Sequence, residues 1–106
     1  MQTPLQLTFH QLPPSPALEA DIKQRVEELE SRFDRIVSCR VSVEAPHRHQ
    51  HSGQLYRVSV DLGVPGRHLV VNGSSDADVA HADAHVAVRD AFDATRRQLE
   101  DMRRRP

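Results

Sequence analysis

The spacing of apolar residues switches between two periods along the chain, and this switch limits the fold more than any other feature. Apolar and polar residues alternate over about 5–10, which predicts a short strand with one buried face. From Pro16 the spacing becomes three or four residues, which predicts a helix that buries one side, with Ser15 as its N-cap. The apolar stripe of this helix consists of Leu18, Ile22, Val26, Leu29, Phe33 and Ile36.

The period of two returns after this helix and predicts three more strands. Residues 37–44 and 56–62 alternate strictly, so each should bury one face and expose the other. The polar, histidine-rich segment 46–53 should be the loop of a hairpin between them. Pro65 and Gly66 mark a turn into a shorter strand around 68–71.

The last part of the chain predicts a second amphipathic helix. Residues 72–82 are rich in Gly, Ser, Asp and Ala and show no sustained period, so we expect a loop. Asp83 is a suitable N-cap for a helix that starts at Ala84. The order β-α-β-β-β-α then predicts an α+β fold in which both helices pack on one face of a four-stranded sheet. The helix stripe consists of Ala84, Val88, Phe92, Thr95, Leu99 and Met102.

Composition narrows the classes of function. The chain has 106 residues, no repeat and no linker, so a single domain over 1–106 is expected. There is no run of about 20 apolar residues and no secretory pattern, which predicts a cytoplasmic protein without a membrane partner. Cys39 is the single cysteine and should be a reduced core residue. The net charge is −1, so any case for nucleic-acid binding depends on local charge.

Two sequence blocks carry a resemblance to a known family. Residues 29–36 read LESRFDRI and are similar to the pattern "LExxFDRI". Residues 91–99 read AFDATRRQL and are similar to "xIDxLxRQL". With these blocks in the same order on the same β-α-β-β-β-α pattern, the chain resembles the short ribosome hibernation-promoting factors and ribosome-associated translation inhibitors, formerly called sigma-54 modulation proteins.

The resemblance implies a non-catalytic factor that binds the small ribosomal subunit and its rRNA. Such a factor lies in the channel for messenger and transfer RNA and blocks translation in resting cells. It needs no cofactor and no small-molecule substrate, and the oligomeric state stays open. The chain stops after the second helix, so the dimerisation domain of the long forms is not expected. Lysines that commonly face rRNA in the family are replaced by Glu28, Ala94 and Asp101, which makes the basic surface thinner.

Arginines are the candidate rRNA ligands, because a planar guanidinium can engage two phosphate oxygens at once. Residues 96–105 include five arginines and only two acidic residues, Glu100 and Asp101, so the local charge is +3. The same arginines also complement the helix dipole, so a purely structural role is an alternative. Ion pairs on the surface are the alternative for the arginines of the first helix. The candidates are Arg97, which lies in the matching block, and Arg96, Arg103, Arg104, Arg105, Arg25, Arg32, Arg35 and Arg89.

Aromatic residues are few, and all of them lie on apolar stripes. Exposed aromatic rings usually stack on the bases when a protein reads an RNA sequence. We therefore expect recognition by shape and phosphate, with little base readout. The aromatic residues are Phe9, Phe33, Tyr56 and Phe92.

Histidines raise a rival hypothesis of a metal-binding or protein-interaction module. His47, His49 and His51 alternate, so in an extended segment their rings would point the same way. His81 and His85 have the i, i+4 spacing of a helical metal pair. No second cysteine and no Glu-x-x-His motif completes a zinc site. The sequence contains neither a Gly-rich phosphate loop nor a G-x-S-x-G motif, so it gives no reason to expect an enzyme.

Overall fold

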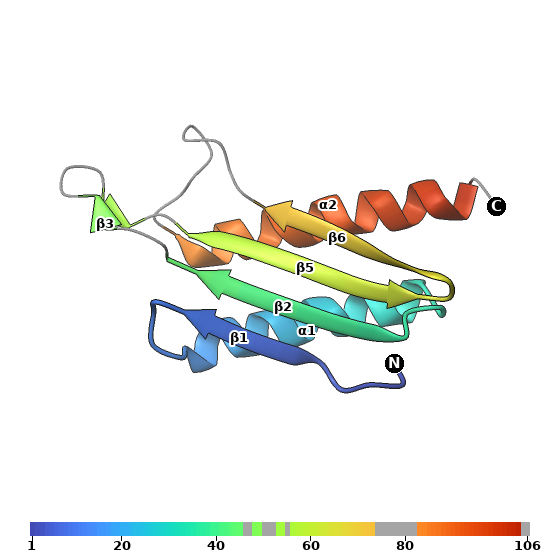
Figure 1. Cartoon of the computed structure of the whole chain (residues 1–106), viewed down its shortest axis with the longest axis horizontal. Coiled ribbons are helices and arrows are strands. Elements are labelled where there is room, and N and C mark those ends of the chain that lie inside the picture. Colours follow the sequence, from blue (N-terminus) through green and yellow to red (C-terminus); the bar gives the residue numbers. More distant parts are fainter. Residues whose placement is uncertain (46–47, 50–52, 55, 74–82, 105–106) are drawn as a thin grey trace.

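The computed structural model of the protein describes residues 1–45, 48–49, 53–54, 56–73 and 83–104 (Figure 1). Its elements follow the order β-α-β-β-β-α, with a short additional ribbon after the second strand. They are β1 (Gln6–His10), α1 (Pro16–Arg32), β2 (Ser38–Glu44), β3 (Arg48–His49), β4 (Gly53–Gln54), β5 (Arg57–Val64), β6 (Arg67–Gly73) and α2 (Ala84–Arg104).

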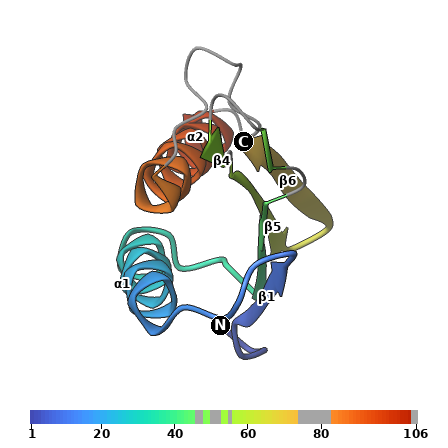
Figure 2. The ribbon, with the colours of Figure 1, turned by 90° about the vertical axis from the view of Figure 1, so that its left-hand side faces the viewer.

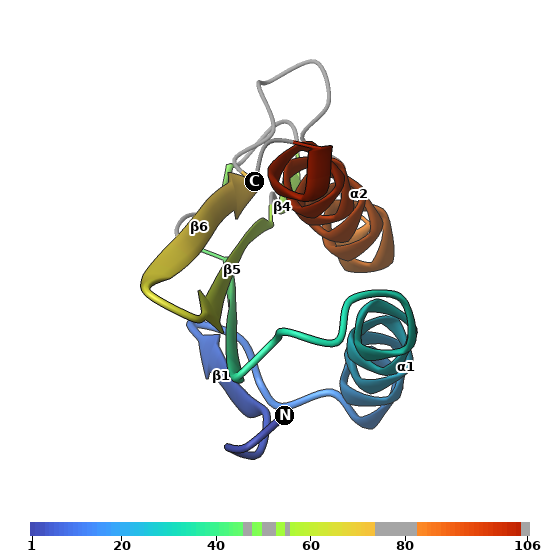
Figure 3. The same ribbon diagram turned by 90° about the vertical axis from the view of Figure 1, so that its right-hand side faces the viewer.

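Four of the strands form one mixed sheet in the order β1-β2-β5-β6. β1 runs parallel to β2, because α1 connects them as a crossover, and the other two pairs are antiparallel hairpins. Both helices pack on the same face of the sheet (Figures 2 and 3). The predicted α+β fold class is therefore confirmed.

The core lies between the two helices and the sheet. Val58, Val60 and Leu62 of β5 are 0% exposed, and the alternate residues of the strand point to the other face, as the period of two predicted. Ile22 of α1 and Val88 of α2 are equally buried against them. The opposite face of the sheet is open and polar.

None of the described helices is long and apolar enough to cross a membrane.

Both predicted N-caps are confirmed. The Ser15 hydroxyl accepts a hydrogen bond from the Leu18 amide at 3.2 Å. The Asp83 carboxylate accepts one from the His85 amide at 2.9 Å. Each side chain satisfies an amide that has no partner within its own helix, which fixes where the helices begin.

The first helix ends four residues earlier than its apolar stripe predicted. Phe33 is the C-cap, with an extended backbone (φ −128°), and its amide donates to the Leu29 carbonyl at 2.8 Å. Phe33 and Ile36 are nevertheless buried, because the segment after the helix folds back over the end of the core. The stripe thus continues past the helix. The described residues also show no ion pair between Glu28 and Arg32, although their spacing is helical.

Two strand boundaries also differ from the prediction. Within the expected loop 46–53, Arg48 and His49 pair with Gln54 and Gly53 to form the β3-β4 ribbon. β6 extends to Gly73, because Asn72 pairs with Ser59 and Gly73 pairs with Val58 across the hairpin. The sequence did not predict this extension, because Asn72 and Gly73 are not part of an alternating apolar pattern.

Cys39 is a core residue of β2, as predicted. It is 1% exposed, and burial, with smaller contributions from Glu30 and Asp61, raises the pKa of its thiol to about 12. A thiol with this pKa stays protonated and unreactive near neutral pH. We expect that a thiol reagent at pH 8 modifies Cys39 only at the rate of unfolding, and that denaturant makes modification complete within minutes. Rapid modification of the folded protein would contradict this burial.

Candidate functional site

The two helices run in the same direction, so both of their carboxyl ends lie at one end of the molecule (Figure 1). The turn between β5 and β6 lies at this end too. A helix carries roughly half a negative charge at its carboxyl end, and two such ends would repel a polyanion. Cations from the side chains must therefore exceed this charge before the end can attract phosphate.

Arg103 joins the ends of the two helices. Its guanidinium lies over the Phe33 ring, 4.4 Å from the ring centroid, which is cation–π geometry. The same group donates a hydrogen bond to the carbonyl of Arg32 at the end of α1. Arg103 thus satisfies an acceptor that the helix leaves free and holds α2 against α1. Sequence reasoning missed this contact, because nothing in either block shows which residues of the two helices meet.

Four arginines at or near this end have free side chains. Arg32, Arg35, Arg97 and Arg104 are exposed, and within the described residues their guanidinium groups have no hydrogen-bond or ion-pair partner. A free guanidinium can bind phosphate without first breaking an internal pair. These four are therefore the strongest of the predicted RNA ligands. Arg105 lies outside the described residues.

A shallow groove between the helices brings together arginines from both. Arg25, Arg32 and Arg96 line this hollow of about 180 Å³, together with Glu28 and Asp93. Two of these arginines are paired: Arg25 donates to Asp21 at 2.8 Å, and Arg96 donates to Glu100 at 3.1 Å. The groove is consequently close to neutral.

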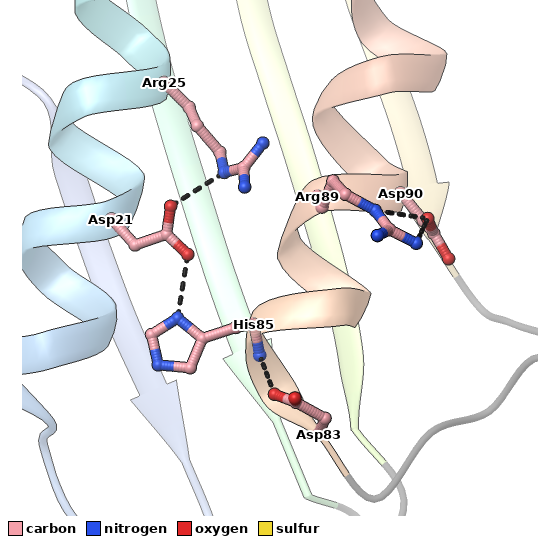
Figure 4. A network of polar contacts seen from close by, with 6 residues as sticks. All are labelled: Asp21, Arg25, Asp83, His85, Arg89 and Asp90. Atoms are coloured by element: carbon pink, nitrogen blue, oxygen red, sulfur yellow. Dashed lines mark hydrogen bonds and ion pairs between the residues drawn. The ribbon is translucent and has the colours of Figure 1, made fainter.

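The amino ends of the helices are joined by a second contact (Figure 4). The Nδ1 of His85 donates to the carboxylate of Asp21 at 2.8 Å, and Arg25 donates to the other oxygen of the same carboxylate. Arg89 turns away from α1 and pairs with its neighbour Asp90 at 3.2 Å (Figure 4). Arg89 is thus a weaker candidate than Arg97.

The carboxyl group of Asp21 depends on this network. Burial raises its pKa, but the hydrogen bonds from His85 and Arg25 outweigh burial and leave the pKa below the ordinary 3.8. A lowered pKa in the folded state stabilises the protein above the ordinary value, and the contribution is lost as the pH falls through the lowered value.

We therefore expect Asp21→Asn to lower the free energy of unfolding by about 0.5–1 kcal/mol at pH 7, as for other partly exposed ion pairs. The difference from the original protein should shrink below about pH 4 and vanish in stronger acid, because the carboxyl group is then protonated in both states. Urea unfolding between pH 2.5 and 7 measures it. A difference that stays constant over this range would mean that the charge of Asp21 has no role.

Most histidines of the rival hypothesis lie outside the part of the chain that the structure describes. His47, His51 and His81 lie outside the described residues, and only the backbone of His49 is described. His85 bonds to Asp21 instead of facing a metal partner. In the described ranges, no group of three or more His, Cys, Asp or Glu side chains is placed to hold a metal ion.

Three positions at which the resemblance implies lysine lie beside the free arginines. Glu28 precedes Arg32 by four residues in α1, and Asp101 follows Arg97 by four residues in α2. Glu28 lines the groove between the helices. Ala94 is half-buried against the core, and Asp101 lines a hollow together with Arg67 and Gln98. Glu28 and Asp101 thus reduce the positive charge of the helical surface, and Asp101 does so in the last turn of α2.

Comparisons with known proteins agree with this architecture. The family described as "Sigma 54 modulation protein / S30EA ribosomal protein" matches residues 5–106. The structure is similar to a ribosomal subunit interface protein from Coxiella burnetii, with 15% identity, a TM-score of 0.74 and coverage of 95% of this chain and 98% of that chain. It is also similar to the N-terminal domain of Protein Y from Thermus thermophilus, with 16% identity, a TM-score of 0.71 and coverage of 92% and 94%. No curated protein matches the sequence significantly.

Proposed function

Because the chain belongs to the sigma 54 modulation protein / S30EA ribosomal protein family, whose members associate with the ribosome, we propose that it binds the small ribosomal subunit and holds it inactive. It acts in the cytoplasm by occupancy, not by catalysis. The partner surface is rRNA in the channel that otherwise holds messenger and transfer RNA. The two sequence blocks predict the same function through their resemblance to this family, and the family is confirmed.

The unpaired arginines at or near the carboxyl end of the helical layer support this proposal best. Arg32, Arg35, Arg97 and Arg104 are exposed, and their guanidinium groups have no partner among the described residues of a chain whose net charge is −1. A protein that gains nothing from global charge but gathers free guanidinium groups in one region is suited to bind a local phosphate surface. Arg25 and Arg96, which line the groove, are paired within their own helices with Asp21 and Glu100.

The aromatic side chains support recognition of phosphate and shape. Phe33 and Phe92 are buried, and Phe9 and Tyr56 are packed against the core, so among the described residues none offers an open ring to a base. Most of the affinity should then come from the release of counterions.

The salt dependence of binding tests this source of affinity. If the four free arginines each neutralise one phosphate, log Kd should change with log salt with a slope of about 3, from roughly 0.7–0.9 per phosphate. Equilibrium binding of fluorescently labelled protein to small subunits at several salt concentrations measures the slope. A slope near zero would point to a ribosomal protein, not rRNA, as the partner.

A cell-free translation assay tests inhibition itself. We expect added protein to reduce synthesis in proportion to the fraction of small subunits that it occupies. Prior loading of the subunits with messenger RNA and initiator transfer RNA should protect them, because both ligands compete for one channel. Equal inhibition of loaded and vacant subunits would rule out occupancy of this channel.

A further inference from the structure

A hollow at the carboxyl end of the helical layer has the chemistry of a nucleotide site. It has a volume of about 370 Å³ and lies where the ends of both helices meet the β5-β6 turn. Binding pockets for small ligands span roughly 300–1,000 Å³, so this hollow is of a size for one small planar group. Its apolar wall comes from Ile36, Val64, Leu99 and Met102.

The rim of the hollow is cationic. Arg35 and Arg103 line it, and Asp34 is the one acidic residue among the described residues that do so. Arg32 and Arg104 adjoin these residues in the sequence and are exposed. Asp101 adjoins Met102 in the same way, and Glu100 is paired with Arg96. Four arginines against Asp34 and Asp101 leave two positive charges, and the two helix ends offset about one of them. The site therefore attracts an anion to the edge of an apolar depression.

Arg103 offers a flat surface at this depression. One face of its guanidinium lies on the Phe33 ring, 4.4 Å from the centroid, and the hydrogen bond to the Arg32 carbonyl fixes its orientation. Arg103 nevertheless remains exposed, so its side chain is accessible to a second planar group. Unstacked RNA bases stack on arginine planes as well as on aromatic rings.

We propose that this hollow binds one unstacked base of single-stranded RNA, with the base against Arg103 and Met102 and the adjoining phosphate on Arg35. An apolar peptide would leave Arg35 and its neighbours without anionic partners, and a bare phosphate would leave the apolar wall exposed to water. A nucleotide satisfies both. The inference rests on the proposed function for the source of the RNA, but its chemistry can be tested without a ribosome.

The test uses methionine labelled with carbon-13 at the methyl group in the full chain. The sequence has two methionines, Met1 and Met102, and Met102 alone of the two lines the hollow, so Met1 is an internal control. Adenosine monophosphate is the probe, and ribose 5-phosphate is the matched ligand without a base. Stacking plus one phosphate contact predicts a Kd of about 1 mM.

We expect the ring current of adenine to shift the Met102 methyl signal in a saturable way and to leave that of Met1 in place. Ribose 5-phosphate at the same concentrations should shift neither signal. Arg35→Ala should weaken binding about 10-fold, and Arg103→Lys, which keeps the charge but loses the plane, should weaken it at least 5-fold. Arg40→Ala on the open face of the sheet is the control variant and should bind like the original protein.

An unmoved Met102 signal, or equal shifts with adenosine monophosphate and ribose 5-phosphate, would overturn the inference. The outcomes distinguish a failure of this inference from a failure of the proposed function. Binding of the small subunit together with a Met102 signal that ignores the nucleotide removes the base pocket and leaves ribosome binding in place. A nucleotide-dependent Met102 shift without binding of the small subunit establishes the pocket and removes the proposed ribosomal role.

Discussion

Replacement of Arg32, Arg35, Arg97 and Arg104 together by alanine should weaken binding to the small ribosomal subunit by at least about 1,000-fold. A hydrogen bond to a charged group contributes roughly 1.5–3 kcal/mol, and 1.4 kcal/mol corresponds to a factor of ten in Kd. Four independent contacts would give about 10,000-fold, and coupling between neighbouring sites reduces this figure. The melting temperature should stay within a few degrees, because these side chains have no partners within the described residues.

Two double variants with the same change in net charge show whether the position of the arginines or only their charge determines binding. Arg97→Ala with Arg104→Ala removes two positive charges from α2. Arg40→Ala with Arg57→Ala removes two from the open face of the sheet, where these residues bond to Gln6 and Glu44. The first variant should lose about 100-fold in affinity, by the same arithmetic, and the second less than about 3-fold. Equal losses would mean that binding follows net charge and not the helical surface.

Leu62→Ala should lower the free energy of unfolding by about 2–5 kcal/mol, the usual cost of truncating a buried leucine. Leu62 is 0% exposed in β5, between β2 and β6 and under the helices. A small domain has only about 5–15 kcal/mol of stability in total, so this single change can leave much of the protein unfolded at 37 °C. Urea denaturation followed by circular dichroism measures the loss.

Val70→Ala provides the control for this prediction. Val70 lies on the neighbouring strand β6, but it is 55% exposed on the open face of the sheet. Its truncation should change the stability by no more than about 0.5 kcal/mol, the typical range for surface positions. If Val70→Ala were as costly as Leu62→Ala, the open face would have to be buried, for instance against a second copy of the chain.

The sheet could be predicted from the sequence because alternation is a local property. Val58, Val60 and Leu62 have to share a face in any strand, and the structure confirms that this face is buried. The end of α1 could not be predicted in this way. Phe33 and Ile36 continue the helical spacing, yet they reach the core from a turn, because the core extends beyond the end of the helix.

The candidate site was predictable only in outline. The excess of arginine near the carboxyl terminus is visible in the sequence, but which arginines are free depends on neighbours from other elements. Arg103 stacks on Phe33, and Arg96 pairs within its own helix, so neither is as available as Arg97. His85 has the spacing of a metal ligand relative to His81, but its partner Asp21 comes from the other helix. Contacts between elements distant in sequence leave no local signal.

Sedimentation of the purified protein with separated ribosomal subunits at low and moderate salt tests the central claim most directly. We predict that the protein sediments with the small subunit and not with the large one, and that the bound fraction falls as the salt concentration rises. The variant without Arg32, Arg35, Arg97 and Arg104 should remain in the supernatant. Absence of binding to the small subunit even at low salt would contradict the account and leave the chain with the fold of its family but not with the proposed function.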